Sequence, residues 1–475
     1  MKSIKKALVL LCCFAMLLGL AACTGTPETP AVTDEPTAPA ANEGADTGTE
    51  PSDAAPAEKV HITYANWGSA DEIVSIQQVA DKFNASQDRI EVEVISIPWE
   101  TYMTELNTMA TAGNLPDTAI MQEKAVLQWA EQGVLADVSS MYEGADSKPL
   151  DYLAFQYDGK PVAYSSANEI LILYYNKDMF DKAGVAYPPD ATDKAWTWDE
   201  FVAAAKQLTI DKNGKHPDES VFDSQNIVQY GVMVENLAWQ LETWCLSNGG
   251  GFVDKSGNVI INDPASIEAI QRVADLYLVD HVAPLSAGTT DDGVSRSLIA
   301  GTCAMTTNGT WNVGTSLGTA KEEGLNYGVA ALPYMKEKIT ICTGGPNVVF
   351  NQSEHPAEAM EWLKWYGQEE NSWDNLIATG IWMPVLEKYY TDESLTHKWV
   401  DNPNFPEYDQ YKSVVVDTAL DTDVTKSAFW YYTNNTTQFL DVLTSALGDV
   451  WTGKVTAEKA INDNLDALKA ALQGS

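Results

Sequence analysis

Histidine, basic residues and cysteine are all scarce in this chain of 475 residues. Five histidines leave little material for a multi-histidine metal site. Only 29 Lys and Arg stand against 67 Asp and Glu, a net charge of −38, whereas nucleic-acid binding requires a basic surface. The same excess of acid disfavours adsorption to anionic lipid. The composition therefore excludes nucleic acid as a partner and gives no reason to expect a metal or another cofactor.

Long apolar runs are also missing, and no stretch approaches the 18 or so residues of a membrane-spanning helix. A shorter apolar run, residues 7–20, follows three lysines and ends in Leu20-Ala21-Ala22-Cys23. This order is typical of an export signal. Small residues before a cysteine resemble the lipobox of bacterial lipoproteins, in which the cysteine is acylated. We expect residues 1–22 to be a lipoprotein signal peptide and Cys23 to carry lipid; a plain signal peptide cleaved after Ala22 is the alternative.

Residues 23–58 have the composition of a tether. Residues 24–58 contain eight acidic residues, no basic residue and no aromatic residue, and are rich in Pro, Thr and Ala. Such a segment cannot bury enough apolar surface to offset its chain entropy, so we expect it to be disordered and extended.

The six cysteines favour an exported protein that relies little on disulfides. Cys12 and Cys13 belong to the signal, and Cys23 is the lipidation candidate. Three cysteines remain, an odd number, at Cys245, Cys303 and Cys342. A Cys303–Cys342 disulfide and three buried thiols are both compatible with the sequence.

The rest of the chain has the pattern of a large α/β protein. Apolar residues make up 45% of the sequence, and 15 Trp and 20 Tyr make it rich in aromatics. Apolar periodicity predicts a strand, helix, strand, helix, strand series at residues 60–65, 71–84, 90–97, 102–112 and 118–121. That order implies a parallel sheet covered by helices. Further strands are predicted at 170–175 and 302–306, and helices at 197–208, 264–280, 356–366 and 457–472.

Two helix starts are marked by cap residues. Thr197-Trp198-Asp199-Glu200 has the pattern of a capping box. Asp263 precedes Pro264, which predicts an N-cap followed by proline in the first turn.

Several motifs occur in the order seen in the extracellular solute-binding proteins of ABC importers, in the sugar-binding family that includes maltose-binding protein. They are spread over nearly all of residues 60–475. The motifs are Asn66-Trp67-Gly68, Gly113-Asn114-Leu115-Pro116-Asp117, Tyr174-Tyr175-Asn176-Lys177-Asp178-Met179-Phe180, Trp196-Thr197-Trp198-Asp199-Glu200, Asn308-Gly309-Thr310-Trp311, Tyr327-Gly328-Val329-Ala330-Ala331-Leu332-Pro333 and Ser427-Ala428-Phe429-Trp430-Tyr431. The chain resembles this family.

The resemblance implies an α/β fold of the type II periplasmic-binding-protein kind, with two discontinuous lobes, a hinge and a central cleft. The N-terminal lobe would comprise residues 59–167 and 332–383, and the C-terminal lobe residues 168–331 and 384–475. The chain would cross between the lobes near Asn168, Ala331 and Pro384. The ligand would lie between the lobes, at the ends of the strands.

The resemblance also nominates ligand-binding residues. Aromatic rings cover the apolar faces of a sugar, while carboxylates and amides bond its hydroxyl rim. Trp430 and Trp311 occupy motif positions of stacking tryptophans, and Glu169 occupies that of a hinge glutamate. The complete set of candidates is Trp430, Trp311, Trp239, Glu169, Trp67, Trp382, Gln122 and Glu123. Trp198, Trp362 and Trp365 are interpreted as packing residues.

The implied function is that of a lipid-anchored, monomeric receptor that delivers a sugar or oligosaccharide to the membrane-spanning subunits of an ABC permease. It would sit outside the cytoplasmic membrane, or in the periplasm of a cell with an outer membrane, and would not be an enzyme. A receptor for a non-sugar solute and a secreted glycosidase remain alternatives. Gly314-Thr315-Ser316-Leu317-Gly318 matches the G-x-S-x-G pattern of serine hydrolases, but a hydrolase needs a strand directly before it.

Overall fold

The structure is a computed structural model and describes residues 59–68, 70–143, 147–285 and 293–474. The predicted signal peptide, the predicted tether and Cys23 lie outside the described residues. The strands are β1 Val60–Asn66, β2 Ile90–Ser96, β3 Thr118–Ile120, β4 Gln156–Tyr157, β5 Lys160–Pro161, β6 Tyr164–Asn176, β7 Ile210–Asp211, β8 Ile227–Val234, β9 Cys303–Gly309, β10 Tyr327–Ala330, β11 Thr340–Val349 and β12 Thr425–Ser427.

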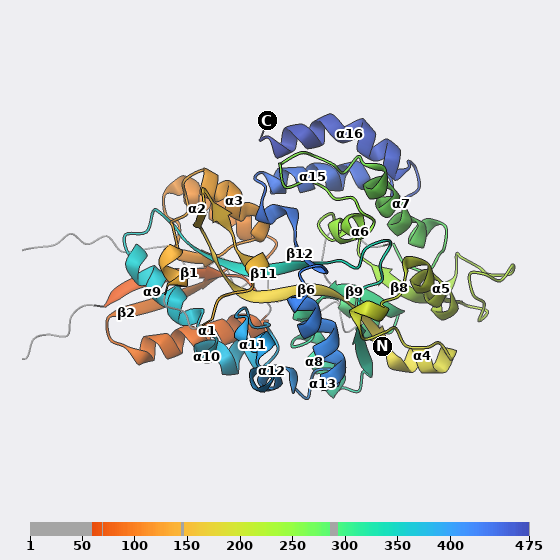
Figure 1. Ribbon diagram of the computed structural model, residues 1–475, viewed down its shortest axis with the longest axis horizontal. Helices are drawn as coiled ribbons and strands as arrows, with labels where there is room; N and C mark the ends of the chain where they lie inside the picture. The colour runs from red at the N-terminus through yellow and green to blue at the C-terminus, as the bar shows by residue number, and fades with distance from the viewer. Residues whose placement is uncertain (1–58, 69, 144–146, 286–292, 475) are drawn as a thin grey trace, which may run out of the picture. The chain divides into compact units, whose positions relative to one another are not determined.

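The helices surround these strands (Figure 1). They are α1 Ala70–Ser86, α2 Tyr102–Ala112, α3 Glu123–Glu131, α4 Lys177–Ala183, α5 Trp198–Leu208, α6 Leu241–Ser247, α7 Pro264–Leu278, α8 Ser316–Glu322, α9 Pro356–Tyr366, α10 Glu369–Ser372, α11 Lys388–Thr391, α12 Glu393–Val400, α13 Tyr408–Tyr411, α14 Thr418–Leu420, α15 Thr436–Leu447 and α16 Ala457–Leu472. Helices α2, α9 and α16 have the predicted bounds.

One mixed sheet joins most of the strands. Its order is β2-β1-β3-β11-β6-β9-β8-β7, with β10 beside β6 and β12 beside β11. β1 is parallel to β2 and to β3, as the β-α-β-α-β pattern predicts. β8 and β9 are also parallel, whereas β6 is antiparallel to both β11 and β9. Parallel pairs therefore lie on either side of an antiparallel centre, and the edge strand β7 is antiparallel to β8.

Strand β6 changes neighbours halfway along its length. Its first part, from Tyr164 to Ile170, pairs with β11, and its second part, from Leu171 to Tyr175, pairs with β9. Figure 1 shows β6 and β11 running through the centre of the fold, between the group of β1, β2 and α1 and the group of β8, β9 and α5. Met383 forms a bridge with Asn168 on β6. Residues near two of the three predicted crossings thus lie against each other close to this change of neighbours, and the crossings themselves stay a prediction.

Local cap signals are correct at both helix starts. Thr197 and Glu200 form the complete capping box at the start of α5. Asp263 has the extended backbone of an N-cap and is followed by Pro264, but its side chain accepts no hydrogen bond from α7. The predicted N-cap at Asp263 and the proline in the first turn are thus confirmed, and the fixed φ of Pro264 suits this helix start.

The core is aromatic as well as aliphatic. Trp362 is fully buried and packs against Phe83 and Trp365, and Trp198 is buried against Trp244. These contacts confirm the packing roles predicted for Trp198, Trp362 and Trp365. Cys245, Cys303 and Cys342 are free buried thiols, so the structure has the second of the two cysteine arrangements.

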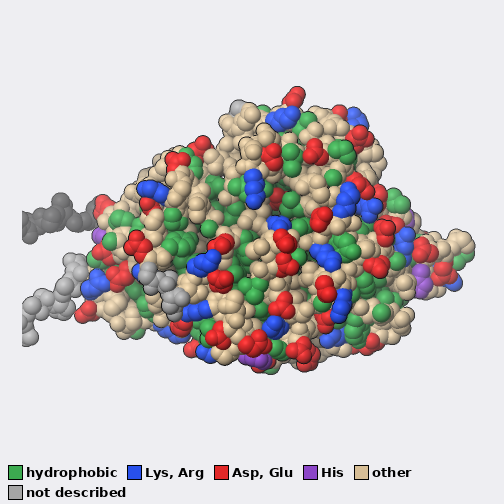
Figure 2. Space-filling model, in the orientation of Figure 1, with side chains coloured by type: hydrophobic (Ala, Val, Ile, Leu, Met, Phe, Trp, Pro, Cys, Tyr) green, Lys and Arg blue, Asp and Glu red, His purple; other side chains and the backbone are tan. Residues whose placement is uncertain are grey.

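Acidic and basic side chains are interspersed over the face of the molecule in Figure 2. In the described part of the chain, no helix is both long and apolar enough to cross a membrane.

Candidate ligand-binding site

Three of the predicted tryptophans meet in one cluster. Trp239 lies in the loop between β8 and α6, Trp311 in the turn after β9, and Trp430 in the turn Phe429–Tyr431. The ring centre of Trp239 is 6.0 Å from that of Trp430 and 6.4 Å from that of Trp311. We call these three residues the tryptophan cluster. Segments nearly 200 residues apart thus combine into one aromatic surface.

The rings of the cluster differ in exposure. Trp311 and Trp239 are half-buried, whereas Trp430 is only 4% exposed. Within the described residues, the indole Nε1 of Trp430 and the side-chain oxygen of Asn236 are buried without a hydrogen-bond partner. Buried indole N–H groups usually find an acceptor. The cluster therefore combines apolar ring faces with one indole donor that has no partner, and a hydroxyl-rich ligand can use both.

A buried carboxyl group holds the Trp430 turn in place. Glu242 on α6 is fully buried, and the backbone N–H of Phe429 donates to both of its carboxylate oxygens, each at 3.2 Å. Burial raises the pKa of Glu242 to about 8. Sequence reasoning missed this residue, because a single acidic residue on a helix carries no motif.

The two predicted acidic candidates lie on or against the central strands β6 and β11. Glu169 lies on β6 opposite Thr343 of β11, and is half-buried. The next backbone N–H, that of Ile170, donates to the hydroxyl of Thr310, beside Trp311, at 3.3 Å. Glu123, at the start of α3, accepts a hydrogen bond from the N–H of Gly344 at 3.1 Å. The centre of β6 and β11 thus brings Glu169 and Glu123 toward the same region as Trp311.

Glu123 sits in a strongly desolvated position. Burial raises the pKa of its carboxyl group to about 7, although the N–H of Gly344 opposes the shift. The neighbouring Gln122 is 6% exposed and precedes α3 without capping it through its side chain. A carboxyl group of this kind can accept or donate a hydrogen bond near neutral pH.

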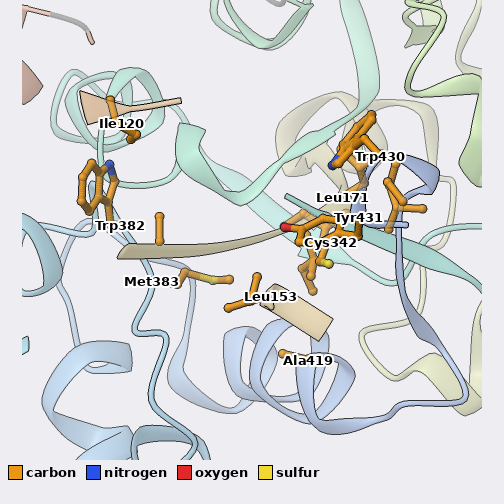
Figure 3. Packing of buried hydrophobic residues seen from close by; sticks show 14 of the residues in the cluster. Ile120, Leu153, Leu171, Cys342, Trp382, Met383, Ala419, Trp430 and Tyr431 are labelled. Atoms are coloured by element: carbon orange, nitrogen blue, oxygen red, sulfur yellow. The ribbon is translucent and has the colours of Figure 1, made fainter. Parts of the chain in front are cut away.

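Trp67 and Trp382 lie outside the tryptophan cluster. Trp67 packs edge to face against Trp99 and Tyr102, with ring centres 5.0 and 4.8 Å apart. Trp382 is 5% exposed, and its Nε1 donates to Glu72 at 2.8 Å. Figure 3 shows Trp382 beside Ile120 and Met383, away from Trp430, Tyr431 and Cys342.

The serine-hydrolase pattern lacks its structural context. β9 ends at Gly309, and a short turn, Thr310–Asn312, separates it from Ser316, the first residue of α8. The strand that must lead directly into a nucleophile elbow is absent from this position. Among the described residues, no group of three or more His, Cys, Asp or Glu is placed to hold a metal ion.

The comparisons with known proteins define the class. Residues 78–407 match the family model of the bacterial extracellular solute-binding proteins. The chain belongs to this family.

Individual relatives are distant. The sn-glycerol-3-phosphate-binding periplasmic protein UgpB of Brucella abortus is 27% identical over 271 residues, which cover 54% of this chain and 58% of that protein. The chain thus spans about 58% of the length of this relative. The maltodextrin-binding protein MdxE of Bacillus subtilis is 23% identical over 382 residues, 78% of each chain.

Solved structures confirm the fold. The ABC substrate-binding protein Lmo0181 of Listeria monocytogenes, in complex with cycloalternan, matches with a TM-score of 0.71 and 22% identity, over 88% of this chain and all of that one. A solute-binding protein of Thermotoga lettingae bound with α-D-tagatose matches with a TM-score of 0.72 and 20% identity, over 87% of this chain and all of that one. The predicted α/β periplasmic-binding-protein fold of type II is confirmed.

Proposed function

We propose that this chain is the extracytoplasmic substrate-binding component of an ABC importer, which captures an uncharged sugar or oligosaccharide without chemically changing it. The observation that carries the proposal is the tryptophan cluster, in which the half-buried rings of Trp239 and Trp311 lie beside the buried Trp430, whose indole N–H has no hydrogen-bond partner. Relatives named for maltodextrin, and neighbours solved with cycloalternan or tagatose, support a sugar ligand.

The charges around the cluster favour a neutral ligand over a phosphorylated one. Glu235 begins the loop that carries Trp239, and Glu169 lies on β6 next to Ile170, which bonds Thr310 beside Trp311. The guanidinium of Arg296 lies 3.3 Å from the carboxylate of Glu235 and is therefore already compensated. Phosphate recognition relies on arginine, lysine or helix N-termini. We therefore infer that the ligand resembles those of the maltodextrin-type relatives rather than sn-glycerol 3-phosphate.

The two lobes and their hinge are part of the proposal. Residues 59–167 with 332–383 would form one lobe, and residues 168–331 with 384–475 the other. The change of neighbours along β6 and the bridge between Asn168 and Met383 support crossings at these positions. The full candidate set, Trp430, Trp311, Trp239, Glu169, Trp67, Trp382, Gln122 and Glu123, would contact ligand from the two lobes.

A thermal-shift series tests the ligand class. A ligand that binds only the folded state raises the melting temperature, and a concentration of about 100 Kd adds about 2.7 kcal/mol of stability. We expect a rise with at least one neutral mono- or oligosaccharide and none with sn-glycerol 3-phosphate. A rise with the phosphate alone would contradict the proposed ligand class.

Chromatography of the same mixtures should recover the sugar unchanged, whereas hydrolysis products would identify a glycosidase.

The proposal places the protein at the membrane through lipid on Cys23, as a monomer that docks on the permease. Cys23→Ser should move the protein from the membrane fraction to the soluble fraction, or leave its precursor uncleaved, with sugar affinity unchanged. Cys12→Ser removes a thiol from the same leader without touching the lipobox, and should leave the protein with the membranes. Recovery of the wild-type protein entirely in the medium, without lipid by mass spectrometry, would disprove the anchor.

A further inference from the structure

The neighbouring parallel strands β8 and β9 end where the loops of Trp239 and Trp311 begin. Val234, the last residue of β8, pairs with Thr307 of β9. Glu235 follows β8 directly, and Asn308 is the next residue of β9. The chain continues from Glu235 to Trp239 and from Asn308 to Trp311. The side chains at these strand ends are therefore placed to fix both tryptophan-bearing loops.

A buried hydrogen-bond bridge joins the two strand ends. The amide Nδ2 of Asn308 donates to a carboxylate oxygen of Glu235 at 3.3 Å, and Nε2 of Gln240 donates to the same oxygen at 3.4 Å. The backbone between Glu235 and Gln240 carries Trp239, so this carboxylate closes the loop around it. Asn308 and Glu235 are both fully buried. Breaking such a bridge leaves a buried polar group unsatisfied, which is costly.

The other side of Asn308 holds the Trp311 turn. Its Oδ1 accepts hydrogen bonds from the backbone N–H of Gly309 at 2.7 Å and from Nδ2 of Asn312 at 3.0 Å. Asn312 also donates to the carbonyl of Gly309 at 3.1 Å. The turn that carries Trp311 is thus tied to the same asparagine that reaches Glu235.

The ring of Trp311 rests directly on Gly309. A Cβ atom placed on Gly309 would lie only 1.7 Å from the Trp311 ring. The φ angle of Gly309 is −79°, which other residues adopt readily, so glycine is required here for space and not for its backbone freedom. The hydroxyl of Tyr174 donates to the Gly309 carbonyl at 2.8 Å, which holds the backbone under the Trp311 ring in position.

We propose that Asn308 is a positioning residue for ligand binding, which sets the spacing of Trp239 and Trp311 through its bonds to Glu235 and to the Trp311 turn. A rigid, preformed aromatic surface binds more tightly because less ordering remains to be done when ligand arrives. The effect on affinity rests on the proposed function, whereas the effect on the ring spacing does not.

The experiment reads the ring spacing and the affinity separately. Closely spaced indole rings give exciton-coupled bands in far-ultraviolet circular dichroism, and Trp311→Phe defines the part of the ligand-free spectrum that depends on Trp311. Asn308→Ala should produce a difference spectrum of the same sign and shape, and should weaken sugar binding about tenfold, equivalent to about 1.4 kcal/mol. Gly309→Ala should produce the same spectral change, because it displaces the Trp311 ring without breaking the bridge.

Asn84→Ala is the matched control. The side chain of Asn84 makes two hydrogen bonds to the backbone of Val92 and belongs to the α1–β2 region. Its loss should lower the melting temperature while the spectrum and the affinity stay those of the wild type. If Asn308→Ala behaves like this control, Asn308 is structural only and the inference is wrong.

Two further variants keep the test decisive. Asn308→Ser keeps an acceptor for the Gly309 N–H but cannot reach Glu235. It replaces the alanine variant if Asn308→Ala fails to fold.

Asn308→Asp places its carboxylate against that of Glu235 and should alter the spectrum. Adding Glu235→Gln should restore the wild-type spectrum, because the donor and the acceptor of the bridge are then exchanged. Absence of this rescue would overturn the role of the bridge. If no sugar binds the wild-type protein, the proposed function fails while the spectra still decide the positioning role.

Discussion

Replacing Trp311 by alanine should weaken sugar binding by about thirty- to several-hundredfold. The ring is half-buried, packs on Trp239 and presents apolar area of the kind that anchors a ligand. Removing such an anchor costs about 2–4 kcal/mol of binding free energy, and each 1.4 kcal/mol is a factor of about ten. Because the ring is only half-buried, the free energy of unfolding should change less than it does for a core tryptophan, where truncation costs about 3–5 kcal/mol.

Trp430 should behave differently, because it is nearly completely buried. Its ring contacts Phe429 and Trp239, so Trp430→Ala should lose both stability and affinity. Trp430→Phe keeps most of the volume and removes the unpartnered indole N–H, so it isolates the contribution of that donor. Isothermal titration calorimetry and denaturant unfolding on each variant separate the two effects.

Trp365→Ala is the matched control for Trp311→Ala. Trp365 is also half-buried and packs on Trp362 and Phe83, away from the tryptophan cluster. It should lose stability with no change in affinity. Undiminished binding by Trp311→Ala would show that the cluster is packing and would remove the observation on which the proposed function depends.

The elements that the sequence predicted well are those whose pattern is local. Helices α2, α9 and α16 carry apolar residues at helical spacing and begin and end where predicted. β6 was predicted only over its apolar half, residues 170–175. Its first half contains Ser165, Ser166 and Asn168, which are buried because β11 pairs with them and not because they are apolar.

β11 was not predicted at all, although it lies in the middle of the sheet. Its sequence includes Gly344, Gly345 and Pro346, which in a local reading indicate a turn. The strand tolerates them because its register with β6 shifts between Gly344 and Pro346. An irregular central strand is recognised only from its neighbours, which lie far away in the sequence.

In the candidate site, too, residues in a local motif could be nominated from the sequence, whereas residues whose role depends on distant neighbours could not. Motif positions nominated Trp311, Trp430 and, approximately, Trp239, and the structure brings the three rings together, while their contact with ligand stays a prediction. Glu235, Glu242 and Asn308 were not predicted as supports, because their roles depend on which strand ends and turns become neighbours. A buried carboxyl group has no sequence signature that separates it from the many exposed acidic residues of this chain.

Glu242 gives the second large expected effect, a pH-dependent gain in stability on neutralisation. The pKa of its buried carboxyl group is raised to about 8, whereas the unfolded chain has an ordinary glutamate. The folded protein therefore holds a proton that the unfolded chain releases, and this contribution to stability is fully present only below the unfolded pKa of about 4.3. It is lost progressively as the pH rises toward 8.

Glu242→Gln should remove this loss while keeping an acceptor for the Phe429 N–H. We expect the free energy of unfolding at pH 8 to exceed that of the wild type by a few kcal/mol, because the folded and unfolded pKa values differ by roughly three to four units at about 1.4 kcal/mol each. The gain should shrink as the pH approaches 5. Glu93→Gln, an exposed position on β2, should give no comparable difference. Urea unfolding of both variants and the wild type at pH 5, 6.5 and 8 measures the trend, and a gain from Glu242→Gln that is the same at every pH would show that the buried carboxyl group does not titrate as inferred.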